Sequence, residues 1–196
     1  MKLGVCVPYR DRELHLNEFI PKVGKYLKDR NIDFQMYFCH QVDDKLFNRG
    51  ATKNIAAKHA LEEGCDYIVW HDIDMIPVDG GGADYSFPEK APRHIATKIE
   101  QMDWQLKYHE YFGGAVLFSK AQLEATNGYS NDYWDWGMED DDLYWRCVEK
   151  GYYEQKTLQE IKQKMVLSLD GKSTHIKINP SRELRRIPTD LSLIHI

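Results

Sequence analysis

The chain has 196 residues, of which 42% are hydrophobic and 29% charged, and its formal net charge is -5. That length suffices for one globular domain whose core needs no disulfide support. The acidic balance argues against a general nucleic-acid binder, and no apolar run reaches the roughly 20 residues of a membrane span. The opening residues 1–8 are too short for a signal peptide, and the cysteines lack close spacing, which favours reduced structural thiols.

The first half of the sequence alternates short apolar runs with amphipathic segments. The expected strands cover residues 3–8, 34–39 and 67–70. A helix capped by Asp11 should follow the first strand, and a helix capped by Asn48 and ended by Gly64 should follow the second. The expected buried positions of the two helices are Leu16, Phe19, Ile20, Val23 and Leu27, then Ile55, Ala56, His59 and Ala60. This alternation predicts an α/β protein whose ligands bind beyond the carboxyl ends of parallel strands.

The second half is less regular. Residues 79–92 are rich in glycine and proline and should form a loop, before a strand at 115–118. Ser119 is expected to cap a helix over 121–126. A further helix should run over 139–150 and end at Gly151. After residue 152 the pattern weakens and predicts no element.

Two carboxylates, Asp72 and Asp74, directly follow the apolar run 67–70. At a strand end such side chains diverge, so one can ligate a divalent cation while the other binds a neighbouring group. Carboxylate oxygen suits Mn²⁺ or Mg²⁺, and such a cation neutralises a diphosphate leaving group. Asp-x-Asp also occurs by chance on many surfaces, and only its place after a buried strand favours the metal interpretation.

The segment from Trp134 to Asp142 joins two tryptophans to four consecutive carboxylates. Acidic residues at a helix N-terminus offset the helix dipole by about 0.3–1 kcal/mol each, which explains one or two of them but not four. Asp140 shares a helix face with Leu143 and Tyr144, three and four residues later. There it can act as a general base toward a sugar hydroxyl. The tryptophans would form a platform for a sugar ring.

Arginines also lie where ligands are expected, near strand ends and helix starts. They are Arg10, Arg12 and Arg49. Guanidinium groups bind phosphate in a bidentate manner, although each of these arginines taken singly is more often an ordinary surface residue. The paired glycines Gly113 and Gly114 permit close approach of the backbone to a ligand, or simply bend the chain before the next strand.

Six segments in this order resemble the beta-1,4-galactosyltransferase family. They are Pro-x-Arg-x-Arg from Pro8, Phe-Asn-Arg from Phe47, Asp-x-Asp from Asp72, Tyr-Phe-Gly-Gly from Tyr111, Trp-x-Trp-Gly-x-Glu-Asp-Asp-Asp from Trp134 and Asn-Pro-x-Arg from Asn179. The resemblance implies a GT-A fold with a mostly parallel central sheet, as one catalytic domain over 1–190 with an unassigned tail at 191–196. It also implies an inverting, metal-dependent transfer of galactose from UDP-galactose to a carbohydrate hydroxyl.

The resemblance further implies roles for individual residues. Asp140 would be the catalytic base, and Asp74 and His175 would hold Mn²⁺, with Mg²⁺ as the alternative. The donor-binding residues would be Pro8, Arg10, Arg12, Phe47, Arg49, Asp72, Tyr111, Gly114 and Trp136. The acceptor-binding residues would be Tyr108, Glu139, Asp141 and Arg182. By the same resemblance, a tyrosine at position 111 implies that the donor sugar is galactose rather than N-acetylgalactosamine.

The chain departs from the family pattern at several positions. Asp135 and Met138 replace glycines of the acidic segment, which should reshape the acceptor site. Lys172 stands in place of a metal-ligating methionine, and Glu183 in place of an aromatic residue that faces the acceptor. Three alternatives therefore stay open: the same chemistry with another UDP-sugar such as UDP-N-acetylgalactosamine, a nucleotide-sugar or glycan-binding module without turnover, and a hydrolase of nucleotide sugars.

The expected partners are a UDP-sugar donor and a glycan or glycoconjugate acceptor, with no nucleic acid. Animal members of the family are Golgi membrane enzymes with disulfides, whereas this sequence shows no anchor. We therefore expect a free-standing, cytoplasmic catalytic domain of bacterial or viral origin.

Overall fold

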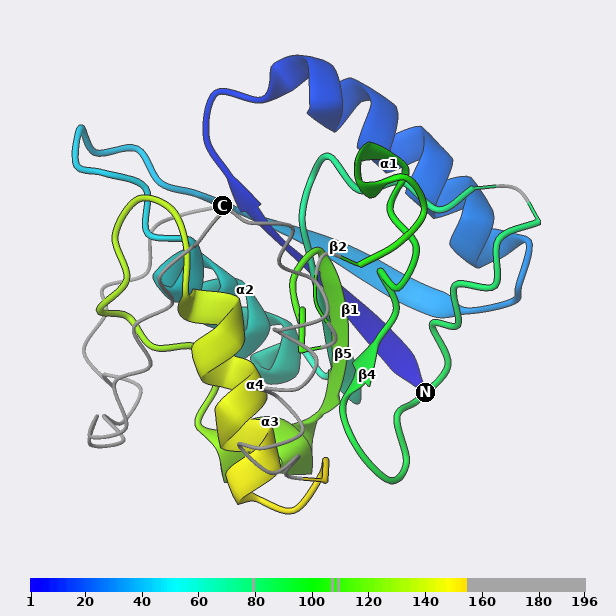
Figure 1. Cartoon of the computed structure of the whole chain (residues 1–196). Helices are drawn as coiled ribbons and strands as arrows, with labels where there is room; N and C mark the ends of the chain where they lie inside the picture. Colours follow the sequence, from blue (N-terminus) through cyan, green and yellow to red (C-terminus); the bar gives the residue numbers. More distant parts are fainter. Residues whose placement is uncertain (79, 107, 109, 155–196) are drawn as a thin grey trace.

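A computed structural model describes residues 1–78, 80–106, 108 and 110–154 (Figure 1). One five-stranded sheet has the order β2-β1-β3-β5-β4. Its strands are β1 (Lys2–Tyr9), β2 (Asp33–His40), β3 (Tyr67–His71), β4 (Arg93–His94) and β5 (Ala115–Ser119). The helices are α1 (Glu13–Lys28), α2 (Arg49–Glu62), α3 (Lys120–Thr126) and α4 (Glu139–Glu149), and Glu100–Met102 forms the short 3₁₀ helix η1. The predicted α/β alternation is confirmed; β4 and η1 were not predicted.

The sheet is mixed, with β5 running opposite to the other four strands. β1 pairs in parallel with β2 and β3, whereas β5 is antiparallel to both β3 and β4. The reversal brings the start of β5 beside the end of β3, where Ala115 pairs with His71. Residues that precede β5 therefore reach the sheet edge at which β1 and β3 end, which is where ligands are expected.

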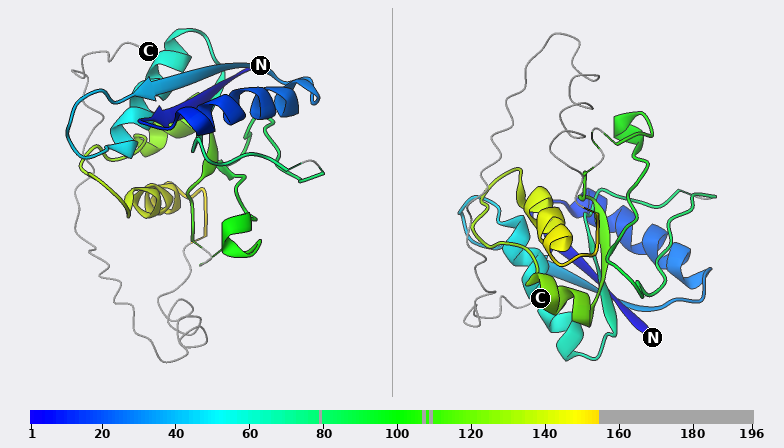
Figure 2. Two further views of the ribbon diagram at one scale, coloured as in Figure 1. Left: turned by 90° about the horizontal axis from the view of Figure 1, so that it is seen from above. Right: turned by 60° about the horizontal axis from the view of Figure 1, so that its bottom comes forward.

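Helices cover both faces of the sheet (Figures 1 and 2). Because side chains alternate along a strand, Leu3, Val5 and Val7 of β1 pack in one cluster with α1. Cys6 and Trp70 face the other way and pack in a second cluster with α2, α3 and α4. The second cluster lies directly beneath the edge where the charged residues gather.

Two predicted helix caps are confirmed and one is wrong. The Asn48 side chain accepts a hydrogen bond from the backbone N–H of Ala51, and Ser119 forms a capping box with Gln122. Asp11 does not cap α1, because its φ of 50° places it in a turn before the helix. The N-cap position is instead taken by Arg12, which makes no side-chain capping bond.

The buried faces of two helices differ from the prediction. Ile20, expected inside, is exposed, so α1 buries a narrower stripe that centres on Phe19, Val23 and Leu27. His59 of α2 is only partly buried. α2 instead buries three consecutive polar residues, Thr52, Lys53 and Asn54. Lys53 faces the carboxylates described below, and Asn54 hydrogen-bonds the backbone of Tyr129.

All four cysteines are buried free thiols, as expected for structural residues. Within the described residues, no helix is both long and apolar enough to cross a membrane. The predictions for Lys172, His175, Arg182 and Glu183 lie outside the described residues. The single domain over 1–190 likewise stays a prediction.

Candidate active site

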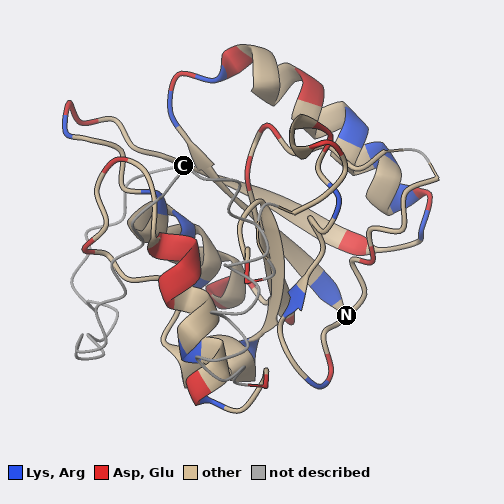
Figure 3. Ribbon diagram, in the orientation of Figure 1, with Lys and Arg blue, Asp and Glu red and all other residues tan. Residues whose placement is uncertain are grey.

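Charged side chains from three segments meet at the edge formed by the end of β3 and the start of β5. Arg49 and Lys53 come from α2, Asp72 follows β3, and Glu139 and Asp140 belong to the first turn of α4. Figure 3 shows this acidic start of α4 beside the basic residues of α2. Residues four apart on a helix share a face, so Arg49 and Lys53 point together toward the carboxylates.

Arg49 lies among three carboxylates. Its Nη1 is 3.0 Å from Oε1 of Glu139, and 3.9 Å from Oδ2 of both Asp72 and Asp140. Burial by itself would lower the pKa of Arg49, but the three negative charges outweigh it and raise the pKa above its ordinary value. The guanidinium is therefore a fixed positive charge in the middle of the site.

Asp72 is held from the side of α2 and from the side of β5. Its Oδ1 forms an ion pair with Nζ of Lys53 at 3.1 Å, and its backbone N–H donates to the carbonyl of Gly114 at 2.7 Å. Burial acts to raise the pKa of Asp72, but Lys53 and Arg49 outweigh burial and lower it. Among the described residues, Asp72 Oδ1 and Glu139 Oε1 are buried and accept no hydrogen bond, although both are ion-paired.

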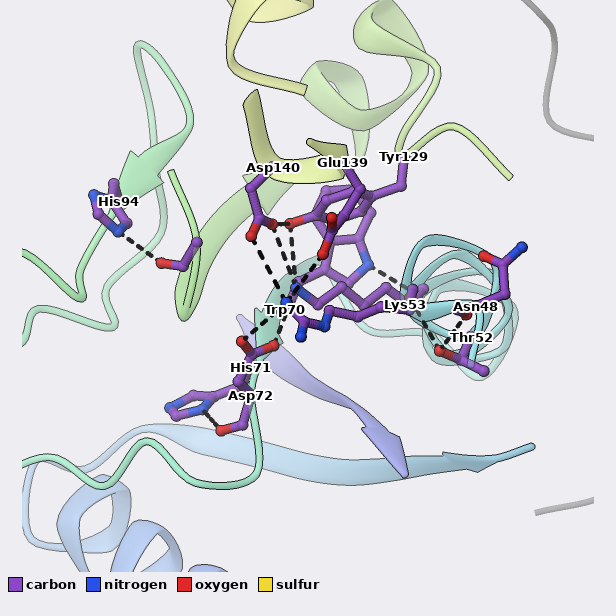
Figure 4. A network of polar contacts seen from close by, with 12 residues as sticks. Asn48, Thr52, Lys53, Trp70, His71, Asp72, His94, Tyr129, Glu139 and Asp140 are labelled. Carbon is purple, nitrogen blue, oxygen red and sulfur yellow. Dashed lines mark hydrogen bonds and ion pairs between the residues drawn. The ribbon is translucent and has the colours of Figure 1, made fainter. Parts of the chain in front are cut away.

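The two oxygens of Asp140 have different surroundings (Figure 4). Oδ1 accepts a hydrogen bond from the Tyr129 hydroxyl at 2.9 Å and lies 3.7 Å from Nζ of Lys53. Oδ2 points toward Gly113, where an added Cβ would lie only 2.6 Å away. The absence of a side chain at Gly113 therefore leaves room for this carboxylate.

The neighbours of Asp140 in the acidic turn differ in burial. Glu139 is 3% exposed, and burial, reinforced by the charge of Asp140, raises its pKa despite the nearby Arg49. Asp141 accepts a hydrogen bond from the exposed Tyr108 at 2.8 Å, and burial again raises its pKa. Burial and the charges of Asp140 and Asp72 raise the pKa of Tyr111 to about 12. Tyr108, Tyr111 and Asp141 thus form the rim beside Asp140.

The predicted phosphate-binding segment lies after β1, and its first arginine is already engaged. Arg10 donates hydrogen bonds to the carbonyls of Gln41, Asp43 and Lys45, and its guanidinium carbon lies 5.4 Å from the centre of the Phe47 ring. Pro8 is buried at the end of β1. Arg12 is exposed and lines an open cavity of ≈ 530 Å³ together with Tyr9, Leu14, His15 and His40. The structure therefore gives Arg10 the role of holding the loop 41–47.

The remaining predicted residues lie at the surface of this edge. Asp74 is exposed just after β3, and Trp136 is 83% exposed in the loop before α4. That loop is tied to Phe47, a predicted donor-binding residue, because the N–H of Asp135 donates to the carbonyl of Phe47 at 2.8 Å. In the part of the chain that the structure describes, no three metal-ligating side chains converge. The predicted metal ligand Asp74 therefore stands on the described structure only as an exposed carboxylate at the end of β3.

Two residues of this site were missed by the sequence analysis. Lys53 is 1% exposed and Tyr129 2% exposed, and both contact Asp140. For Lys53 a helical pattern was available, since positions 49, 53, 56 and 60 follow one face of α2. Tyr129 lies in an irregular segment, and nothing in the sequence around it indicates the contact.

Comparisons with known proteins agree with this arrangement. A family model described as the N-terminal region of glycosyl transferase group 7 matches residues 1–83, and one described as the N-terminal domain of galactosyltransferase matches 93–167. Beta-1,4-galactosyltransferase 1 of Mus musculus is 38% identical over 152 residues, which is 76% of this chain and 37% of that protein. Xylosylprotein 4-beta-galactosyltransferase of Caenorhabditis elegans is 37% identical over 149 residues, 76% of this chain and 50% of that protein. The chain thus spans half the length of these relatives or less.

A solved structure supports the same relationship and corrects one expectation. A mutant of Drosophila beta-1,4-galactosyltransferase 7, in complex with manganese, UDP-Gal and xylobiose, superposes with a TM-score of 0.72 at 26% identity. The match covers 88% of this chain and 82% of that chain. The expected free-standing cytoplasmic domain of bacterial or viral origin is wrong, because the matching relatives are animal galactosyltransferases.

Proposed function

The chain belongs to the beta-1,4-galactosyltransferase family, and from this premise we propose that it transfers galactose from UDP-galactose to a carbohydrate hydroxyl with inversion. The observation that carries the proposal is the pairing of two carboxylates, Asp140 and Asp72, across the shared cations Arg49 and Lys53. A base for the acceptor and a carboxylate for the donor thereby lie at one sheet edge, as a reaction between two bound substrates requires.

In the proposed reaction Asp140 is the general base. It takes the proton of the acceptor hydroxyl, and the acceptor oxygen forms a bond to the anomeric carbon of galactose. The bond from that carbon to the β-phosphate oxygen breaks, and UDP leaves with the electron pair. Attack on the face opposite UDP inverts the anomeric centre. Oδ2 of Asp140 suits this role because it faces the space beside Gly113, away from the interior contacts of Oδ1.

The donor side is built around the end of β3. Asp72 Oδ1 is a buried acceptor without a hydrogen bond among the described residues, which suits a ribose hydroxyl. The exposed carboxylate of Asp74 supplies a hard oxygen ligand of the kind that Mn²⁺ or Mg²⁺ prefers. We propose Asp74 and His175 as the protein ligands; a bound cation would neutralise the charge of the departing diphosphate. Arg49 would add a second positive charge on the same side.

The acceptor side is formed by the start of α4 and the rim before β5. Glu139 and Asp141 flank the base, and the exposed rings of Tyr108 and Trp136 offer flat faces for a sugar. A xylose-containing acceptor is a reasonable first choice, since two of the relatives are named for a xylosyl protein or were solved with xylobiose. Arg182 is proposed on this side by the family resemblance alone.

The test is acceptor-dependent release of UDP. Wild-type protein would be incubated with Mn²⁺ and UDP-galactose, UDP-N-acetylgalactosamine or UDP-glucose, with and without β-xylosides and N-acetylglucosaminides. We expect release that needs both metal and acceptor and is fastest with UDP-galactose. Asp140→Asn should lower kcat by roughly 10²–10⁴-fold, whereas Glu149→Gln, on the exposed end of the same helix, should not change it.

The same assay separates the alternatives. Release at one rate with or without an acceptor would identify a nucleotide-sugar hydrolase instead. Binding of UDP without release from any donor would identify a binding module. Fastest release with UDP-N-acetylgalactosamine would keep the chemistry and change the donor.

A further inference from the structure

The ammonium group of Lys53 is a buried cation in the floor of the proposed site. It forms an ion pair with Asp72 at 3.1 Å and lies 3.7 Å from Oδ1 of Asp140. It donates a hydrogen bond to the Tyr129 hydroxyl at 3.3 Å and lies 4.8 Å from the centre of that ring. Figure 4 shows these groups converging from α2, the end of β3, the segment before α4 and α4 itself. One cation therefore connects the donor side of the site to the base.

The surroundings enclose this ammonium, since Lys53 is 1% exposed and its backbone is tied to the rings around it. The carbonyl of Lys53 accepts a hydrogen bond from the indole N–H of Trp70 at 2.8 Å, and the Trp70 and Tyr129 rings meet edge to face at 4.7 Å. The next residue, Asn54, hydrogen-bonds both the carbonyl and the N–H of Tyr129. A buried lysine side chain in these surroundings has little freedom to follow a movement of Asp72 or Asp140. Its partners must instead adjust to it.

The consequence falls on the carboxylate of Asp140. Its Oδ1 is held by Tyr129, whose hydroxyl accepts a hydrogen bond from Lys53 and donates one to Asp140. This chain of donors fixes the rotation of the carboxylate. Oδ2 is then directed to the space beside Gly113, which the Tyr111 hydroxyl also borders. If Lys53 and the Tyr129 hydroxyl no longer held Oδ1, Arg49 would be the remaining cation near Asp140 among the described residues. Arg49 lies 3.9 Å from Oδ2, so it would draw the carboxylate toward itself.

We propose that Lys53, acting through Tyr129, is a positioning residue that reserves Oδ2 of Asp140 for the acceptor hydroxyl. The inference rests on the proposed galactosyl transfer. Lys53 contacts neither substrate; its effect is to present the base in one orientation and to link that orientation to Asp72. Removal of the ammonium lets the carboxylate turn toward Arg49, so that proton transfer slows while the binding surfaces remain.

The experiment is a double-mutant cycle with the base. Lys53→Met and Tyr129→Phe would each be made in the wild type and in Asp140→Asn, with Lys58→Met, an exposed lysine of the same helix, as the matched control. We expect each variant to lower kcat by roughly 10- to 100-fold in the wild type, with KM for UDP-galactose changed by less than about threefold. In Asp140→Asn, where the base is absent, the same changes should lower kcat by less than about threefold.

The outcomes are distinct. Equal losses in the two backgrounds, or a loss confined to KM, would overturn the positioning role. If Lys53→Met does not fold, Tyr129→Phe carries the test alone, because it removes only a hydroxyl from a ring that stays buried. If wild-type protein transfers no sugar, the proposed function fails. Crystal structures of the wild type and Tyr129→Phe then decide the inference, and an unchanged Asp140 carboxylate would overturn it.

Discussion

Oδ2 of Asp140 lies where only a glycine at position 113 allows it, because a Cβ on Gly113 would come within 2.6 Å of that oxygen. The same Cβ would meet the Tyr111 hydroxyl at 2.9 Å. Both neighbours are the ends of side chains, which can turn away at small cost to the fold. A methyl group at position 113 should therefore displace the base without unfolding the protein.

Gly113→Ala is accordingly expected to lower kcat by about 100-fold, since a misplacement near 1 Å has an effect of that order. The melting temperature should change by no more than a few degrees. Gly82→Ala is the control, because a Cβ there has no neighbour within 4 Å. Normal turnover by Gly113→Ala would show that Oδ2 is not the reacting oxygen.

Met138 occupies a backbone conformation that suits glycine. Its φ is 73° at the N-cap of α4, at a position where the family resemblance implies a glycine. Met138→Gly should raise the free energy of unfolding by up to about 1 kcal/mol, because the left-handed conformation is unfavourable for a residue with a Cβ. Met138→Ala keeps the Cβ and should give no such gain. Chemical denaturation measures both; equal stability of the two variants would contradict the argument.

Arg10 should stabilise the loop 41–47 even without a nucleotide. Its hydrogen bonds to three carbonyls contribute about 0.5–1.5 kcal/mol each. Arg10→Met should therefore speed backbone hydrogen exchange in this loop by about tenfold or more. Arg12→Met should leave that exchange unchanged, because the Arg12 side chain is exposed and, unlike Arg10, makes no hydrogen bond to this loop among the described residues. Unchanged hydrogen exchange in Arg10→Met would show that Arg10 does not stabilise the loop, and the predicted phosphate contact would be the role left to it.

His71 should make the protein less stable as the pH falls. Its Nδ1 lies 3.0 Å from the Asp72 carbonyl, which can only accept, so Nδ1 carries the proton and Nε2 accepts from the Tyr85 hydroxyl at 2.8 Å. Burial lowers the pKa of His71 despite the Asp72 carbonyl and charge. Below its ordinary pKa of about 6.5 the unfolded chain binds a proton that the folded protein does not, so stability decreases toward the lower folded pKa.

His71→Asn isolates this effect from the other titrating groups. Between pH 7.5 and 5.5 the wild type should lose more free energy of unfolding than the variant, with at most about 1.4 kcal/mol per pH unit from one group. Urea denaturation at the two pH values gives the difference. A larger loss in the variant would reverse the sign and refute the assignment.

Much of the scaffold follows from local sequence. Asn48 and Ser119 cap helices because their side chains bond to the next turn, and Gly64 ends α2 with a φ of 86°. These are interactions among neighbours along the chain, which a single sequence displays. Asp11 failed as a cap because the turn after β1 takes one residue more before the helix begins.

The site was predictable in part. Asp72 and Asp140 stand out because carboxylates follow a buried strand and crowd a helix start. Lys53 and Tyr129 do not stand out in the sequence, because their place in the site depends on contacts with distant residues. Lys53, for example, pairs with Asp72, 19 positions away, and with Asp140, 87 positions away. A lysine on a helix is normally solvated, and only the packing of α2 against the acidic turn makes this one interior.

The reversed direction of β5 determines where the chain can vary without moving the proposed site. The chain leaves the site after Asp72 and returns to it at Gly114, and the hydrogen bond between these two residues closes the excursion. Its ends are pinned by the pairing of β3 with β5. This excursion ends with the rim tyrosines Tyr108 and Tyr111, so exchanges at its exposed positions can change what the rim contacts while the residues at its two ends keep their spacing. Under the proposed function, grafting the exposed part of that excursion between relatives should change the acceptor preference and leave Asp140 in place.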